Sequence, residues 1–284
     1  GVFQDGAFRN RPVFSSGDMF DIERIEVLRG PQSTLYGKNT TAGVVAIYSR
    51  KPTEELSANA ELTAGNLEGA SDASLYRFVG GVSGPLTDTV SGSLGLSYTG
   101  QDHLMDSALS ASDEEANDVD RSSLRGQLQW QPTDALNLRL IGGVLQQDDD
   151  QSLSDVYFEP GSRADTFWQN LQVAGLAESC SSNDPLDLEH CARKAVTSEI
   201  DANEGTLLVD YALDNGWTID SITSYDWFKF EGSINDLFQV ASPILKFQDT
   251  QEADSWQQEL RLTSAGGETV DWLVGTFYYH NEFQ

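Results

Sequence analysis

The sequence has no long hydrophobic run and few basic residues. Of its 284 residues 39% are hydrophobic, but no segment approaches the roughly 20 consecutive apolar residues of a transmembrane helix. A helical membrane protein is therefore excluded. Lysine and arginine together number 17 against 45 acidic residues, which gives a net charge of -28. Because nucleic-acid contacts require clustered basic side chains, nucleic acid is excluded as a partner.

Cysteine is scarce as well, since Cys180 and Cys191 are the only two. We predict a disulfide between them in an oxidising compartment, because the bond would constrain a long polar loop. Two free surface thiols are the alternative. A zinc site is disfavoured, because one adjacent histidine, His190, and two widely spaced cysteines lack the usual paired ligand spacing. No metal site is predicted.

Enzyme and targeting signatures are missing too. The stretch Gly37–Gly43 is glycine-bounded, but its spacing differs from that of a phosphate-binding loop. Neither G-x-S-x-G nor H-E-x-x-H occurs, and no basic start followed by an apolar core marks a signal peptide. The acidic runs 113–115 and 148–150 have the oxygen ligands that Ca²⁺ prefers, although a solvated acidic loop is the simpler interpretation. We predict no enzyme and no cofactor.

From Ser57 onward, apolar and polar side chains alternate, which is the period-2 signature of half-buried strands. The clearest run is Thr89–Thr99. Arg125, Arg139 and Glu259 fall on the polar side of such runs, which indicates a wet or polar interior. A β-barrel membrane protein is compatible with the low hydropathy, because its strands need only about 10 residues and half of those side chains face a polar lumen.

The alternation predicts about nine strands, joined by connections of unequal length. The strands are expected at 57–66, 74–84, 88–99, 121–131, 135–147, 204–213, 217–230, 255–263 and 269–283. Long loops are expected near 100–120, 148–204 and 231–254, with short turns between the other pairs. Short turns on one side and long loops on the other are typical of outer-membrane barrels, whose long loops lie outside the cell. The odd count predicts an incomplete barrel.

The stretch Asp21–Pro52 reads DIERIEVLRGPQSTLYGKNTTAGVVAIYSRKP. Charged residues alternate with β-formers and are then interrupted by Arg29-Gly30-Pro31, which indicates a polar, turn-rich module. Residues 1–55 hold seven basic and seven acidic residues, whereas the rest of the chain is strongly acidic. The change in charge supports a boundary near Pro52.

This stretch resembles the end of the plug domain of TonB-dependent outer-membrane receptors, which follows the pattern "RIEVLRGPQ-x-x-LYG-x-N-x-x-GGVIN". The chain is thus similar to siderophore receptors of that family. The resemblance implies a mainly β fold, in which the C-terminal part of an α/β plug domain (1–55) precedes the first nine or so strands of a transmembrane antiparallel β-barrel (56–284). It also implies that the chain begins inside the plug and that the N-terminal TonB box lies outside it.

The resemblance and the alternating charges predict plug–barrel contacts in this motif. The residues concerned are Arg24, Glu26, Arg29, Gly30 and Pro31. Their charges would pair with inward barrel carboxylates such as Glu61 or Glu259. Ordinary surface ion pairs, each worth about 0–1 kcal/mol, are the alternative.

Three plug residues are predicted ligand contacts: Arg9, Arg11 and Phe14. In the family, outward-facing plug loops contact the ligand, and arginines suit the carboxylate or catecholate oxygens of an iron chelate. The two arginines could equally form plug–barrel salt bridges.

The function implied by the resemblance is active uptake across the bacterial outer membrane. The expected ligand is a ferric siderophore, and the energy would come from the TonB–ExbB–ExbD complex. Cobalamin, haem or a carbohydrate is the alternative ligand. A passive porin or a soluble carbohydrate-binding β protein would share the strand pattern but lack the Asp21–Pro52 module. The barrel would also contact outer-membrane lipid and lipopolysaccharide.

Overall fold

The computed structural model describes most of the chain as strands. The described residues are 1–10, 21–37, 39–67, 73–104, 106–107, 117–151, 159–174, 189–190, 196–234, 247–267 and 269–284. No helix among them has the length and apolar character needed to cross a membrane. Two sheets dominate this part of the chain, one of four strands and one of nine.

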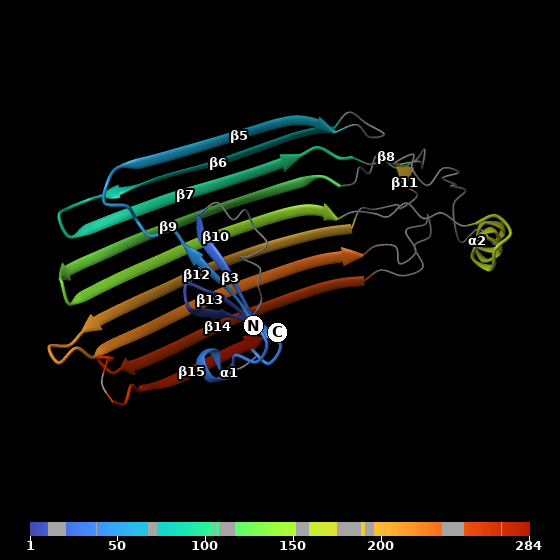
Figure 1. Ribbon diagram of the computed structural model, residues 1–284. Coiled ribbons are helices and arrows are strands. Elements are labelled where there is room, and N and C mark those ends of the chain that lie inside the picture. Colours follow the sequence, from blue (N-terminus) through green and yellow to red (C-terminus); the bar gives the residue numbers. More distant parts are fainter. Residues whose placement is uncertain are drawn as a thin grey trace.

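The larger sheet is an antiparallel meander in which each strand pairs with its neighbours in the sequence (Figure 1). Its strands are β5 (Ser57–Leu67), β6 (Ala73–Pro85), β7 (Val90–Gln101), β9 (Val119–Thr133), β10 (Leu136–Gln151), β12 (Val196–Ala212), β13 (Thr218–Ile234), β14 (Phe247–Thr263) and β15 (Leu273–Phe283). The nine strands expected from the alternation are therefore all present. Their backbone groups pair across eight consecutive ladders.

The two faces of this sheet differ in polarity as the alternation predicts. On one face, Leu94 and Leu140 are about half exposed, at 49% and 51%. On the other face, Gln127 and Arg139 are buried. Exposed apolar residues on one face and buried polar residues on the other are the arrangement of a barrel wall between lipid and a polar lumen.

Several strands are longer than the sequence predicts. β10 continues to Gln151, β12 begins at Val196 and β14 begins at Phe247, so the connections predicted at 148–204 and 231–254 are shorter than expected. On the face that carries Leu140 the added residues are polar, as are Asp148 and Glu199, which pair in the ladder. The opposite face keeps apolar residues such as Ala202. The apolar half of the alternation on the outer face therefore ends before the backbone pairing does.

The smaller sheet contains β1 (Val2–Gln4), β2 (Ala7–Arg9), β3 (Ile22–Arg29) and β4 (Gly43–Ser49) in the order β2-β1-β4-β3, with the short helix α1 (Ser33–Tyr36) between β3 and β4. Its core consists of Phe3, Phe8, Val44 and Ala46. Position 43 of the motif requires glycine, because a Cβ there would lie 2.6 Å from the carbonyl oxygen of Leu28. The sheet lies against one face of the meander (Figure 1).

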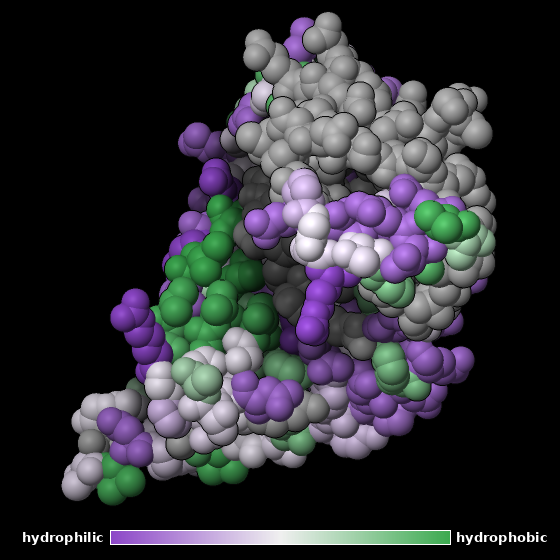
Figure 2. Space-filling view, turned by 90° about the vertical axis from the view of Figure 1, so that its right-hand side faces the viewer, coloured by the Kyte–Doolittle hydropathy of each residue, from purple (hydrophilic) through white to green (hydrophobic). Residues whose placement is uncertain are grey.

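The remaining elements are small. Helix α2 spans Arg163–Val173. Its N-cap is Ser162, whose side chain accepts a hydrogen bond from the Asp165 N–H at 3.1 Å. β8 (Asp106–Ser107) and β11 (Glu189–His190) form a short parallel pair. Viewed from the end of the strands, the coloured surface is largely hydrophilic, and hydrophobic residues gather in one patch on its left side (Figure 2).

Candidate functional site

The β1–β2 hairpin of the small sheet packs against the wall of the large one. Its turn is Asp5-Gly6, with φ of 49° and 82°, the left-handed pair that a two-residue hairpin turn requires. A Cβ on Gly6 would lie 2.7 Å from Cδ1 of Ile222 on β13. Glycine therefore lets the turn approach the wall closely, and this approach places Asp5 and Arg9 beside the charged residues of the wall.

Arg9 forms the most deeply buried ion pair of the described residues. Its guanidinium donates to Glu204 of β12, and Nη1 lies 3.3 Å from Asp226 of β13. The side chains of Arg9 and Glu204 are only 2% and 1% exposed. Ser224 Oγ accepts a further bond from Nη1 at 3.3 Å. Such enclosure allows the charges to interact with little screening by solvent.

Asp5 is the acidic counterpart of Arg9 across the turn. Its carboxylate accepts from Arg125 Nη2 of β9 at 3.1 Å and lies 3.5 Å from Arg139 Nη1 of β10. Within the small sheet it also accepts from the N–H and the hydroxyl of Ser49. Arg125 continues the chain of contacts by donating to Glu204.

The wall thus presents two basic residues followed by two acidic ones across consecutive strands: Arg125 on β9, Arg139 on β10, Glu204 on β12 and Asp226 on β13. The hairpin places Asp5 against the two arginines and Arg9 against the two carboxylates. We call these four residues, with Asp5 and Arg9, the latch. Every charge in the latch has an opposite charge within 3.5 Å.

The end of the small sheet joins the latch through Gln127 of β9. Its Nε2 donates to Asp21 at 2.5 Å and to the carbonyl of Arg50 at 3.1 Å, while its Oε1 accepts from Arg139 at 2.7 and 2.9 Å. Burial raises the pKa of the Asp21 carboxyl, and the bond from Gln127 and three nearby arginines oppose that rise.

Neutral contacts secure the hairpin from the other side. Gln257 of β14 accepts from the Phe8 N–H at 3.1 Å and donates to the Phe8 carbonyl at 3.2 Å. This side chain therefore satisfies both backbone groups of a residue on β2, which is an edge strand of its sheet. The Phe8 ring also meets Tyr279 of β15 edge to face, with centroids 5.7 Å apart.

The motif residues predicted as plug–barrel contacts lie elsewhere. Arg24 pairs with Glu26 at 2.7 Å and with Glu23 at 3.3 Å, lies over the Tyr48 ring at 3.8 Å, and has a side chain 48% exposed. These partners all belong to the small sheet. Arg29, Gly30 and Pro31 follow at the end of β3, where Gly30 takes a φ of 84°.

Contact between those motif residues and the barrel stays a prediction. The partners suggested for them, Glu61 and Glu259, pair instead with Arg77 at 3.2 Å and Arg261 at 2.5 Å within the large sheet. Of the predicted ligand contacts, Arg9 lies in the latch, the second role considered for it. Arg11, Phe14, Cys180 and Cys191 lie outside the described residues.

Only part of the latch can be predicted from the sequence. Alternation along the strands marks Arg125 and Arg139 as inward-facing, and the same signal applies to Glu204 and Asp226. Their partner Asp5 was not identified, although the Asp5-Gly6 pair marks a hairpin turn. The sequence carries no signal that joins residues 120 positions apart, as Asp5 and Arg125 are.

The chain is similar in sequence to proteins of known families. Residues 1–44 match the family model of the TonB-dependent Receptor Plug Domain. The chain is 31% identical over 163 residues to the iron-regulated outer membrane virulence protein of Vibrio cholerae, which covers 57% of this chain and 22% of that protein. It is 36% identical over 124 residues to the ferrioxamine B receptor of Salmonella typhimurium, covering 44% of this chain and 16% of that protein. The chain thus spans less than a quarter of these relatives.

Solved structures match nearly the whole chain at low identity. The ferric yersiniabactin uptake receptor of Yersinia pestis aligns with a TM-score of 0.70 at 18% identity, covering 99% of this chain and 39% of that one. The ferripyoverdine receptor of Pseudomonas aeruginosa gives 0.71 at 19% identity, with 99% and 36% covered. These matches show the fold that the chain shares with them, a small sheet packed against part of a β-barrel.

Proposed function

Because this chain belongs to the TonB-dependent receptors of the bacterial outer membrane, we propose that the whole protein takes up a ferric siderophore by active transport. In this proposal the ligand binds on the outer side of the plug. The TonB–ExbB–ExbD complex then pulls on an N-terminal box, the plug moves, and the ligand passes to the periplasm. The similarity to receptors named for ferrioxamine B, ferric yersiniabactin and ferripyoverdine supports an iron chelate as the ligand.

The latch is the observation that supports a moving plug. The plug hairpin is held to the wall by ion pairs and hydrogen bonds, among them Arg9 to Glu204 and Arg125 to Asp5. Polar groups of this kind can exchange protein partners for water when the plug moves, so each contact can break and re-form. A passive porin needs no such plug, and the occupied inner face of the wall therefore favours gated uptake.

The ligand contacts in this proposal remain those predicted from the sequence. Arg11 and Phe14 are candidates on the plug. Arg9 is committed to the latch in the closed receptor, since its side chain is 2% exposed. No cofactor is proposed, and iron is cargo within the chelate. On the outside of the barrel we propose contacts with outer-membrane lipid and lipopolysaccharide.

Uptake of radiolabelled iron tests the proposal. Cells that lack their own siderophore receptors are made to express the whole protein and are given ferric hydroxamate and ferric catecholate chelates. We expect saturable uptake of at least one chelate, and loss of that uptake, with binding retained, in a strain without TonB.

Uptake that persists without TonB would contradict active transport. Binding and uptake of cobalamin, haem or a carbohydrate, with no response to any ferric chelate, would replace the siderophore with that ligand.

A further inference from the structure

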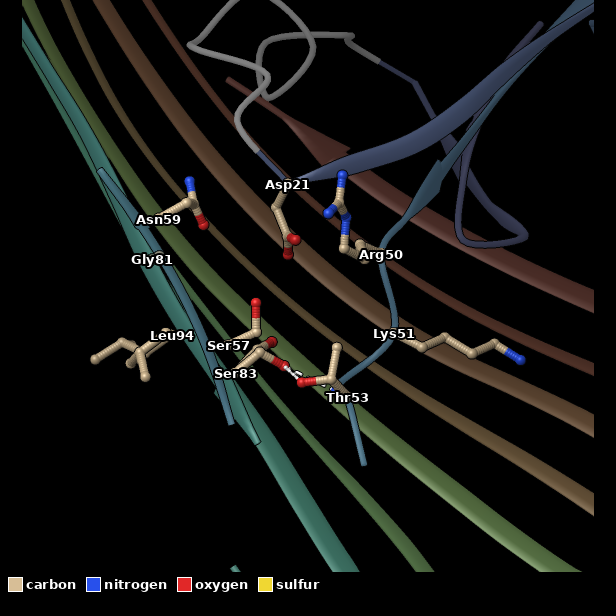
Figure 3. A pocket seen from close by; sticks show the side chains of 12 residues that line it. Asp21, Arg50, Lys51, Thr53, Ser57, Asn59, Gly81, Ser83 and Leu94 are labelled. Atoms are coloured by element: carbon tan, nitrogen blue, oxygen red, sulfur yellow. Dashed lines mark hydrogen bonds between the residues drawn. The ribbon is translucent and has the colours of Figure 1, made fainter. Parts of the chain in front are cut away.

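A polar cavity of about 290 Å³ separates the end of the plug from the first barrel strands (Figure 3). On the plug side it is lined by Asp21, Arg50 and Lys51. On the barrel side Val82 and Leu94 belong to the lining, together with residues whose side chains are small and polar or absent: Ser57, Asn59, Gly81, Ser83, Ser93 and Gly95. These residues come from β5, β6 and β7.

The wall at this cavity differs from the wall at the latch. At the latch, long side chains such as Arg125 and Glu204 extend from the wall to the plug. At the cavity, Gly81 and Gly95 lie opposite each other in neighbouring strands, so the wall carries no side chain at these two positions. The hydrogen bonds between Thr53 and Ser83, at 2.8 and 2.9 Å, join the wall to the connector that leads into β5, which is already tied to the barrel.

The plug side of the cavity is fastened elsewhere. Asp21 and the carbonyl of Arg50 both accept from Gln127 on β9, which lies opposite Ser93 in the ladder and outside the cavity lining. Widening the space between the plug and β5–β7 therefore breaks none of these contacts. Moving the plug away from β9–β14 would break the latch.

From this asymmetry we infer that the ligand crosses the receptor at the cavity, between the end of the plug and β5–β7, while the latch keeps the plug on β9–β13. The inference rests on the proposed uptake function and names its route. Arg50 suits the anionic oxygens of a hydrated iron chelate, whereas the Lys51 side chain extends away from the cavity (Figure 3), and the Gly and Ser wall leaves room for the ligand. In such a receptor the plug shifts aside on one wall and does not leave the barrel.

A removable obstruction in the cavity tests the route in the whole receptor. Ser93→Cys is modified with a bulky reagent attached through a disulfide, and Ser91→Cys, which lies two residues away on the same strand and outside the cavity lining, receives the same reagent. The unsubstituted receptor, also treated, controls for Cys180 and Cys191.

We expect modified Ser93→Cys to lose at least tenfold in ferric-chelate uptake with unchanged chelate binding, and to recover after reduction. Modified Ser91→Cys should transport normally. Normal uptake by modified Ser93→Cys would overturn the route.

A second measurement keeps the route testable without a ferric ligand. The rate at which a small charged thiol reagent labels Ser93→Cys is compared in energised cells and in cells treated with an uncoupler, and Ser224→Cys, buried beside Arg9, serves as the latch control. We expect labelling to accelerate at least fivefold at position 93 and to stay unchanged at 224. Equal acceleration at both positions would mean that the plug leaves as a whole and would refute the route. Failure of the unsubstituted receptor to take up any chelate would refute the siderophore proposal alone.

Discussion

Replacing Glu204 with glutamine should loosen the plug strongly, because this carboxylate joins both halves of the latch. Its side chain is 1% exposed and accepts from Arg9 and Arg125, which are 2% and 12% exposed. Glutamine keeps the volume but removes the charge that faces two guanidinium groups. Breaking a buried ion pair in this way costs about 3–5 kcal/mol, because the remaining charge stays buried without its partner. At about 1.4 kcal/mol for each factor of ten, plug release should become about two to three and a half orders of magnitude more favourable.

Plug release can be measured by urea titration of the whole receptor in detergent. A thiol introduced as Ala46→Cys reports the release, since Ala46 is 3% exposed in the plug core and becomes reactive when the plug detaches or opens. The free energy of release is compared with and without Glu204→Gln.

Glu61→Gln is the matched control. Glu61 also pairs with an arginine, Arg77, at 3.2 Å, but its side chain is 67% exposed, so its loss should cost about 0–1 kcal/mol. If Glu204→Gln costs no more than Glu61→Gln, the latch does not hold the plug. A double-mutant cycle with Arg9→Met should give a coupling energy of about 0.5–3 kcal/mol if the two residues act together.

Three further changes test the other contacts of the plug. Gln257→Ala removes both partners of the Phe8 backbone and should weaken plug retention by about 1–3 kcal/mol, as measured by the same urea titration. Gly6→Ala should weaken it by at least about 1–2 kcal/mol, because alanine disfavours a φ of 82° and its Cβ would meet Ile222. Asp21→Asn should raise plug stability at pH 7. The pKa of Asp21 is raised in the folded plug, so its ionised carboxylate destabilises the plug above that pKa. This destabilisation disappears as the pH falls below 3.8, the ordinary pKa of the group. The free energies of plug release of the two proteins should therefore converge between pH 7 and pH 3.

Each of these changes has its own control. Gln258→Ala on the same strand loses bonds to Ser221 and Thr223 of the barrel only, and should leave plug release unchanged. Gly30 has a φ of 84°, close to that of Gly6, but a Cβ added there meets nothing within 4 Å. Gly30→Ala therefore measures the backbone cost without the clash. For Asp21, a difference between the two proteins that does not change with pH would contradict the assigned cause.

The barrel strands could be predicted from the sequence because one face of each must be apolar. That requirement imposes a period of two, which marks every strand of the meander. It fails toward one end, where β12 begins at Val196 and not at 204, because the face that is apolar farther along the strand there carries polar residues such as Glu199 and Asp201. Without a continuous apolar outer face, neither the period nor the composition distinguishes a strand from a loop.

The site was harder to predict, because a pattern identifies the face of a residue and not the partner it meets. Arg24 and Glu26 alternate along β3 as interface residues would, yet they pair with each other. β3 is an edge strand of the plug sheet, on the side opposite the β1–β2 hairpin that carries Asp5 and Arg9. The order of the plug strands thus places Asp5 and Arg9 beside β9–β13, and that order is set by long-range pairing.

The arrangement of charges in the latch also fixes where the plug sits. Across the wall the order is Arg125, Arg139, Glu204 and Asp226, two basic residues and then two acidic ones. A shift of the hairpin by one or two strands, each about 4.8 Å wide, toward β9 would bring Arg9 against the basic residues. Like charges in a buried setting repel strongly, so that position is disfavoured. In the proposed uptake, a displaced plug would therefore return to one position, which an apolar interface of the same size would define less sharply.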